Sequence, residues 1–399
     1  MAKKLKTPQD YLDFFTTDFE PDEAPKAIWV ELGNGVKSLK QHCIKLPDNL
    51  KIRHPYIVFI IFVNLKKYKF LGQWEKVAWE IPIKFKGTPF ILTHRKFGFE
   101  IISNYESEEI IDLAIEAMTN IHKSMKFAEN LIEPEIKALL QKGAITLENE
   151  YSNIRNRYEF FREQAKCEFE SIETTKKNSE LVLDKGLNEA IKSHNAYLKR
   201  INAGNYYLTS MLDSYFSLLE HTLVLLLPFI KGISLANINL ETYIGNNWKE
   251  KYKIVFPLNT DKEALRLLER LDKIKEDYRN PLTHGYFQKN GHSFYVHMKN
   301  LGAIPMSLTK TKQNLKFHFG GLGHYTYIEI CKCFDDCDIY FADNELTKYG
   351  MSYIKSSLSI AFDTQSCKKY QSAMKSLKHF DKFIKLMTHE HERAMNMDW

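Results

Sequence analysis

One short stretch of the sequence brings together an arginine, an amide and a histidine: Arg279, Asn280 and His284. An imidazole can take a proton from a ribose 2′-hydroxyl or return one to a leaving 5′-oxygen. A guanidinium can bind the scissile phosphate through two N–H groups and stabilise the charge that builds on it. The neutral amide of Asn280 can orient either group. These residue types predict cleavage of an RNA phosphodiester without a metal ion.

The residues before this stretch predict a helix that ends close to it. Leu265, Leu268, Leu271 and Ile274 recur every three residues, as on the apolar face of a helix over Asp261–Tyr278. Thr260 or Asp261 is the expected N-cap, and Pro281 ends the helix or restarts it at a first-turn position. The polar residues therefore belong at a helix corner open to solvent. The alternative is that they only cap carbonyls or form a surface ion pair.

Arg279, Asn280 and His284 resemble the signature of the HEPN superfamily (higher eukaryotes and prokaryotes nucleotide-binding domains). Its ribonucleases carry Arg-x4–6-His, often with a polar residue directly after the Arg. Tyr286 extends the match to the Arg-x4-His-x-Tyr form of the HEPN toxins that are paired with nucleotidyltransferase antitoxins. The resemblance covers roughly residues 205–399 and implies a helical bundle there.

The chain departs from the family directly after Tyr286. Where the family continues as a helix, Gln288–Gly291 is typical of a turn into strand-like sequence. We therefore expect a strand-rich insertion before the final helix of the bundle. Its strands are expected at Ser293–Met298, Leu315–Phe319 and Tyr325–Cys331, with a turn at Leu301–Pro305.

The resemblance implies a metal-independent endoribonuclease that cleaves single-stranded RNA, such as a tRNA loop or an mRNA. It gives His284 the role of general acid and base, Arg279 that of phosphate clamp and Asn280 that of orienting group. Tyr286 would be a site of inhibitory adenylylation. Related proteins act as homodimers in antiphage defence, in abortive infection or as toxins, so a phage-derived trigger or an antitoxin is an expected partner. A non-catalytic RNA-binding or adaptor protein is the alternative, and a helical assembly protein without nucleic acid is a third.

Two further groups of polar residues could serve the same chemistry. Asp213, Ser217 and Glu220 follow helical spacing within an apolar helix expected at Tyr206–Ile230, and HEPN domains commonly aim such side chains at the Arg/His corner. Near the end of the chain, four lysines fall on one helical stripe that could bind phosphate. These lysines are Lys375, Lys378, Lys382 and Lys385. In both cases the alternative is a solvated helix face.

Composition limits the class of protein. The 399 residues are 44% hydrophobic, enough for two or three folded domains. The net charge of +6 is mild and does not by itself indicate nucleic acid. No apolar run approaches the roughly 18 residues needed to span a bilayer, and no secretory leader is visible, so we expect a cytoplasmic protein without a membrane partner. Six cysteines without framework spacing agree with a reducing compartment.

Patterning along the chain predicts an α+β protein in three parts. Residues 1–104 are expected to form a strand-rich recognition or sensor domain, residues 105–204 an extended helical segment, and residues 205–399 the HEPN-like nuclease domain with its strand-rich insertion. The strands expected in the first part are Pro55–Val63, Trp79–Phe85, Phe90–Thr93 and Phe97–Ile102. The helices expected in the second are Glu108–Leu140 and an extended helix or helical hairpin over Glu148–Lys199.

A cysteine cluster is the one group with metal-ligand chemistry near the corner. Cys331, Cys333 and Cys337 follow His318 and His324, but Cys-x-Cys-x3-Cys matches no common zinc knuckle. Buried cysteines are therefore expected here, with zinc as the alternative. Neither a metal nor a cofactor is predicted for the chain.

Overall fold

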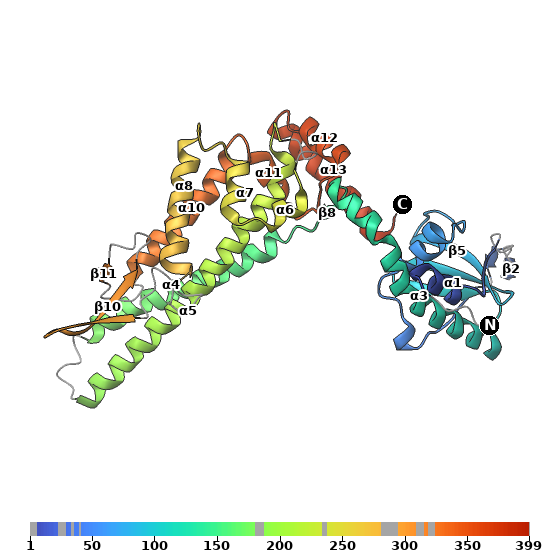
Figure 1. The fold of residues 1–399 in the computed structure, drawn as a ribbon, viewed down its shortest axis with the longest axis horizontal. Helices are drawn as coiled ribbons and strands as arrows, with labels where there is room; N and C mark the ends of the chain where they lie inside the picture. Colours follow the sequence, from blue (N-terminus) through green and yellow to red (C-terminus); the bar gives the residue numbers. More distant parts are fainter. Residues whose placement is uncertain are drawn as a thin grey trace. The chain divides into compact units, whose positions relative to one another are not determined.

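The computed structural model describes residues 6–22, 29–32, 36–39, 41–179, 187–233, 238–280, 294–308, 315–317 and 324–398. They form an α+β protein with two compact units, residues 1–139 with 386–399 and residues 140–385 (Figure 1). The expected division into a sensor domain, a helical segment and a nuclease domain stays a prediction. One helix, α5 (Leu187–Leu226), runs through residue 204 without a break.

The first unit is built on a five-stranded antiparallel sheet with the strand order β1-β5-β6-β7-β4. The strands are β1 (Phe19–Pro21), β5 (Val77–Phe85), β6 (Thr88–Arg95), β7 (Gly98–Ser103) and β4 (His42–Cys43). A hairpin of β2 (Trp29–Leu32) and β3 (Val36–Leu39) forms a separate two-stranded sheet. Lys86 and Gly87 join β5 to β6 with positive φ angles of 49° and 79°, as two-residue hairpin loops require. The strands expected at Trp79–Phe85, Phe90–Thr93 and Phe97–Ile102 are confirmed.

Helices cover one face of this sheet. They are α1 (Pro8–Phe15), the 3-10 turn η1 (Asp48–Leu50), α2 (Tyr56–Phe59) with the π-helical turn η2 (Ile60–Leu65), and α3 (Glu108–Gln141). From α3, Ala114, Met118 and Ile121 are fully buried against Ile81 and Ile83 in a shared core. The helix expected at Glu108–Leu140 is thus confirmed, and its apolar stripe is part of the core of the first unit.

The strand expected at Pro55–Val63 is wrong, because these residues form α2 and η2. Val58, Ile61 and Phe62 are fully buried, a spacing of three and four residues that belongs to a helix. The segment is also apolar outside its buried face, where Ile57, Phe59, Ile60 and Val63 are partly exposed and Tyr56 is exposed. A short continuous apolar run carries no period that separates a buried strand from a buried helix.

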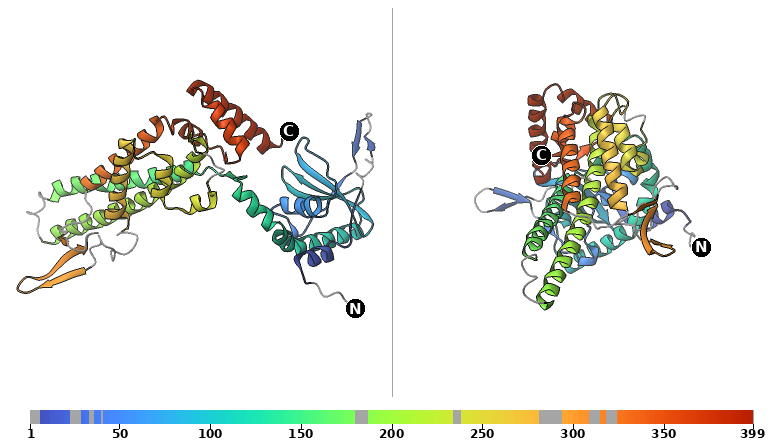
Figure 2. Two further views of the ribbon diagram at one scale, coloured as in Figure 1. Left: turned by 45° about the horizontal axis from the view of Figure 1, so that its top comes forward. Right: turned by 90° about the vertical axis from the view of Figure 1, so that its left-hand side faces the viewer.

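The second unit is organised around a helical hairpin of α4 (Tyr151–Ser179) and α5, which lie side by side in Figures 1 and 2. The helices are antiparallel, since Arg200 pairs with Glu168 at 3.4 Å and His221 accepts a hydrogen bond from the Glu150 N–H at 3.0 Å. Of the two forms expected for Glu148–Lys199, the hairpin is the one found. The helix expected at Tyr206–Ile230 is the second half of α5, followed by the 3-10 turn η4 (Leu227–Phe229).

Further helices pack on this hairpin, on one another or on η4. They are α6 (Leu240–Gly245), α7 (Trp248–Val255), α8 (Lys262–Ile274) with the π-helical turn η6 (Lys275–Arg279), α10 (His324–Asp343), α11 (Lys348–Ile354), α12 (Thr364–Ala373) and the beginning of α13 (Leu377–Asn396), whose residues from 386 on belong to the first unit. α10 packs on α5, where the rings of Tyr215 and Phe334 stack with centroids 3.6 Å apart. No helix in the described ranges is long and apolar enough to cross a membrane.

The second unit also contains two small antiparallel sheets. One has the order β11-β10-β9, with β9 (Phe294–Met298), β10 (Gly302–Leu308) and β11 (Leu315–Phe317); the other pairs β8 (Thr146–Leu147) with β12 (Ile360–Ala361). The strands expected at Ser293–Met298 and Leu315–Phe319 are confirmed where they are described. The turn expected at Leu301–Pro305 is wrong in position. Asn300, with a φ of 69°, lies in the actual turn, and β10 begins at Gly302.

The strand expected at Tyr325–Cys331 is also wrong, because it lies within α10. The buried residues of α10 recur with helical spacing over four turns, whereas the expected strand ended after the second turn. A window this short hides the helical period. The buried residues that follow this spacing are Tyr327, Ile330, Cys331, Phe334, Cys337 and Phe341, and Cys333 is buried beside them.

The packing of α11 against α5 gives a direct test of the second unit. A Cβ added at Gly350 would lie 2.7 Å from Cδ2 of Leu226 and 3.1 Å from Cβ of Phe229, both of which are fully buried. We expect Gly350→Ala to lower the free energy of unfolding by about 1–3 kcal/mol, because added volume in a dense core forces strain. Urea unfolding followed by far-ultraviolet circular dichroism measures the change.

Gly245→Ala is the matched control. Gly245 is the last residue of α6, and nothing lies within 4 Å of the position of an added Cβ. This variant should unfold like the wild type or slightly later, since alanine favours helices. Equal losses in the two variants would contradict the packing explanation.

Candidate functional site: the Arg279 corner

Arg279 is the last residue of the π-helical turn η6, and Asn280 is its C-cap. The Asn280 N–H bonds back five residues to the Lys275 carbonyl, which is the pattern that defines a π turn. His284 and Tyr286, the other residues of the motif, lie outside the described residues. The structure therefore places the phosphate-clamp and orienting residues of the expected site, but not its acid and base.

The helix before Arg279 forms for the reasons expected from its sequence. Asp261 is the N-cap of α8, and its carboxylate accepts a hydrogen bond from the Ala264 N–H at 2.9 Å. Leu267 and Leu271 are fully buried on the apolar face. The π turn then widens the helix and rotates the side chains that follow relative to a regular α-helix. Such single π turns occur frequently at functional sites.

A carboxylate on α5 fixes Arg279. Its Nε donates to Oδ1 of Asp213 at 2.8 Å, and its guanidinium carbon lies 5.8 Å from the centre of the Phe216 ring. The Arg279 side chain keeps 29% of its surface exposed and that of Asp213 keeps 43%. The two contacts hold the guanidinium in one orientation at a surface that solvent reaches.

Glu220, about two turns further along α5 than Asp213, binds a buried lysine of α7. Lys251 is only 2% exposed, and its ammonium lies 2.7 Å from Glu220 Oε1. Without this partner the charge of Lys251 would be buried alone, which is costly. Ser217 behaves differently, because its exposed hydroxyl donates to the Asp213 carbonyl of its own helix at 2.8 Å. The structure thus brings Asp213, but not Ser217, to Arg279.

Further ionic contacts join α7 to α8 beside the corner. Lys249 of α7 pairs with Asp272, and its ammonium lies 3.9 Å from Glu276. Lys275 lies between these pairs, with its ammonium 5.6 Å from the centre of the Trp248 ring. Burial and the neighbouring Arg279 charge lower the pKa of Lys275. We call Asp213, Glu220, Lys249, Lys251, Asp272, Lys275, Glu276 and Arg279 the corner network.

The sequence analysis missed most of this network. Lys249, Lys251 and Lys275 have no motif spacing, and each meets its partners only through contacts between helices. In the sequence, the apolar stripe of α8 was the one signal for these contacts. It predicts that residues after the stripe, on the same side of the helix, lie close to α5. The stripe does not identify the partners.

The four lysines expected to bind phosphate are all exposed. Lys378, Lys382 and Lys385 lie on α13 at spacings of four and three residues, so they share one face of that helix. Lys375 precedes the helix. A common exposed face agrees with the expected stripe, and it agrees equally well with a solvated helix surface.

The cysteine cluster is a set of core side chains on α10. Cys331, Cys333 and Cys337 are at most 6% exposed, and burial raises the pKa of each thiol, for Cys333 to about 11. All three cysteines lie on the helix α10. Within the described ranges, no three His, Cys, Asp or Glu side chains are grouped as metal ligands.

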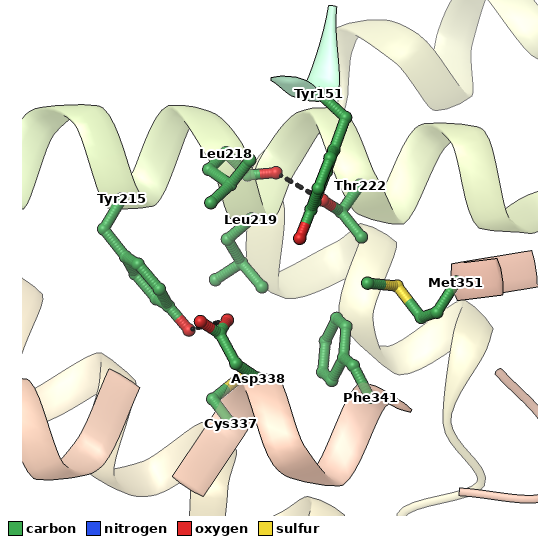
Figure 3. A pocket seen from close by; sticks show the side chains of 9 residues that line it. All are labelled: Tyr151, Tyr215, Leu218, Leu219, Thr222, Cys337, Asp338, Phe341 and Met351. Atoms are coloured by element: carbon green, nitrogen blue, oxygen red, sulfur yellow. Dashed lines mark hydrogen bonds between the residues drawn. The ribbon is translucent and has the colours of Figure 1, made fainter. Parts of the chain in front are cut away.

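Away from the corner, the side chain of Asp338 lies between α5 and α10 in surroundings that resemble those of a catalytic acid. In Figure 3 the Tyr215 hydroxyl meets Asp338, from which it is 3.1 Å away. Arg155 pairs with the same carboxylate from α4. Burial raises the pKa of Asp338, and the Arg155 charge opposes this shift. The cavity beside it measures about 10 Å³, room for one water molecule at most, so no substrate fits and the site is structural.

The raised pKa of Asp338 predicts a pH dependence of stability. The folded protein holds this proton more tightly than the unfolded chain, whose pKa is near 3.8, so ionisation of Asp338 lowers stability as pH rises. Asp338→Asn removes this titration. We expect the free energy of unfolding of the variant, relative to wild type, to increase between about pH 4 and pH 7. Urea unfolding at several pH values measures it, and a constant or falling difference would contradict the assignment.

Comparison with known proteins found no match. No protein-family model, no curated protein and no solved structure matches the chain. The resemblance to HEPN ribonucleases therefore depends on the residues of the motif and on the helices that carry them.

Proposed function

We propose that the chain is a metal-independent endoribonuclease of the HEPN type that cleaves single-stranded RNA, such as a tRNA loop or an mRNA. The observation that carries the proposal is the arginine of the motif on a π turn, held by Asp213 at 2.8 Å and still open to solvent. A phosphate clamp needs a fixed orientation and an accessible guanidinium.

The proposed reaction is an internal transfer within the RNA. The 2′-oxygen attacks phosphorus, and its proton passes to a base; the bond from phosphorus to the 5′-oxygen breaks, and that oxygen receives a proton. The products are a 2′,3′-cyclic phosphate and a 5′-hydroxyl, with no net consumption of water. His284 moves the protons, Arg279 balances the charge on the phosphoryl oxygens, and Asn280 orients one of these groups.

Asp213 acts in this scheme as a positioning residue. Its carboxylate takes the Nε–H of Arg279, which fixes the plane of the guanidinium. The same negative charge lies close to the site where an anionic phosphate would bind, so it weakens attraction in the ground state. This opposing effect favours the second candidate, an RNA-binding or adaptor protein without catalysis, and activity measurements separate the two.

Control is part of the proposal, because a free ribonuclease would damage its own cell. The chain would serve antiphage defence, abortive infection or a toxin system. The first unit would sense a phage-derived trigger, or an antitoxin would modify Tyr286. A nucleotide on that tyrosine adds bulk and negative charge two residues from His284, and both would repel substrate.

The first functional prediction concerns the two residues of the motif. We expect Arg279→Ala and His284→Ala each to reduce RNA cleavage by about 10²–10⁴-fold, because each removes a group that acts in the transition state. RNA end sequencing after expression in a bacterial host, together with cleavage of a labelled oligonucleotide in EDTA, measures the loss.

Lys253→Ala is the control for this experiment. Lys253 is an exposed residue of α7 that pairs only with its neighbour Glu250 at 3.0 Å among the residues described. Cleavage by the control should equal that of wild type. Equal cleavage by all four proteins would remove the ribonuclease proposal, and RNA binding without cleavage by any of them would establish the adaptor.

The second functional prediction concerns assembly. One arginine and one histidine are sparse for a complete active site, so we propose a homodimer that brings two corners to a shared cleft. Light scattering should then give twice the mass of 46.9 kDa. Co-expression of an Arg279→Ala chain with a His284→Ala chain should restore part of the cleavage if residues from both chains serve one site. A monomer that is active at assay concentration contradicts this arrangement.

A further inference from the structure

A groove lies between α8 and α10, with a volume of about 390 Å³. Arg266, Arg270 and Lys273 line it from α8 at spacings of four and three residues. Asp272 of the corner network lies two residues, or about 200° around the helix, from Arg270. The groove therefore follows a different face of α8 from the corner network.

The groove carries an excess of positive charge. Lys332 adds a fourth cation from α10, and Glu329 and Asp336 are the acids, so the lining has a net charge of +2. Both arginines are paired, Arg270 with Asp336 at 2.7 Å and Arg266 with Glu263 at 3.5 Å. Lys273 and Lys332 form no ion pair with another residue in the described parts of the chain, so both ammonium groups can meet an anion from solution.

The groove ends beside the corner. Tyr278 lines it and is the residue directly before Arg279. A half-buried tyrosine offers an aromatic surface on which a base can stack. The groove along α8 therefore extends to the residue directly before Arg279, although the Arg279 side chain itself is held against α5.

We propose that this groove binds the backbone of single-stranded RNA and leads it to Arg279. The inference rests on the proposed ribonuclease function and adds the path of the substrate. Four cations against two carboxylates fit a chain of phosphates, and a volume of about 390 Å³ fits about one nucleotide at a time. The unpaired ammonium groups would contact phosphates, while Tyr278 would contact a base.

The test measures RNA binding apart from cleavage. The full chain with His284→Ala is titrated against a fluorescein-labelled oligouridine of about 12 nucleotides, and fluorescence anisotropy gives Kd over a range of salt concentrations. Lys273→Glu with Lys332→Glu should raise Kd at least about 10-fold. Lys273→Gln with Lys332→Gln, a milder change, should reduce the slope of log Kd against log salt by about 1.4, the value for two phosphate contacts on a single strand.

The matched control is Lys231→Glu with Lys355→Glu, two exposed lysines outside the groove that give the same change in net charge. It should change Kd less than about 2-fold. Equal weakening in the control and groove variants, or no weakening in either, would overturn the groove as the binding path. Binding of labelled polyglutamate as tightly as RNA would also overturn it, in favour of an acidic protein partner. Groove-dependent RNA binding by a chain whose wild type never cleaves would keep the groove and refute only the ribonuclease.

Discussion

The second unit depends on the contact between the acidic side of α10 and two arginines of α4. Arg162 binds Asp335 through two hydrogen bonds of 2.5 and 2.7 Å, and Arg155 binds Asp338. The Asp338 carboxylate, whose pKa is raised by burial, would be costly beside the aromatic core without its guanidinium. Since a planar fork fixes both direction and distance, these pairs set the position of α10 on the α4–α5 hairpin. The position of α10 in turn defines one wall of the groove along α8.

In this arrangement α8 has two different polar faces. On one, Asp272 and Arg279 meet α7 and α5; on the other, Arg270 and Lys273 face α10. The apolar stripe between them is buried, so the helix cannot turn about its axis without exposing Leu267 and Leu271. A rotation of α8 would therefore move both polar faces together. Residues of the two faces are closest in sequence at the π turn that ends the helix.

The parts of the fold that could be predicted are the elements that carry their own signal in the sequence. The Asp261 cap, the strands β5 to β7 and the long amphipathic helix α3 each have a period or an end signal within one element. The errors at Pro55–Val63 and Tyr325–Cys331 share a cause, since both are short apolar windows inside buried helices. At the site, the sequence identified Arg279 and Asp213, but the partners Lys249 and Lys251 meet the corner only through tertiary contacts.

Charge explains how the Arg279 corner and a basic groove can lie on one helix. Within the corner network, four cations face four carboxylates, so its charges balance and the helices pack without mutual repulsion. Balance stabilises this face but leaves it little attraction for a polyanion. The excess of positive charge lies instead in the groove, where Lys273 and Lys332 remain unengaged by the described residues. Under the proposed function, long-range attraction of RNA would come from the groove, while the corner would supply a single oriented guanidinium, so the two tasks would not compete for the same side chains.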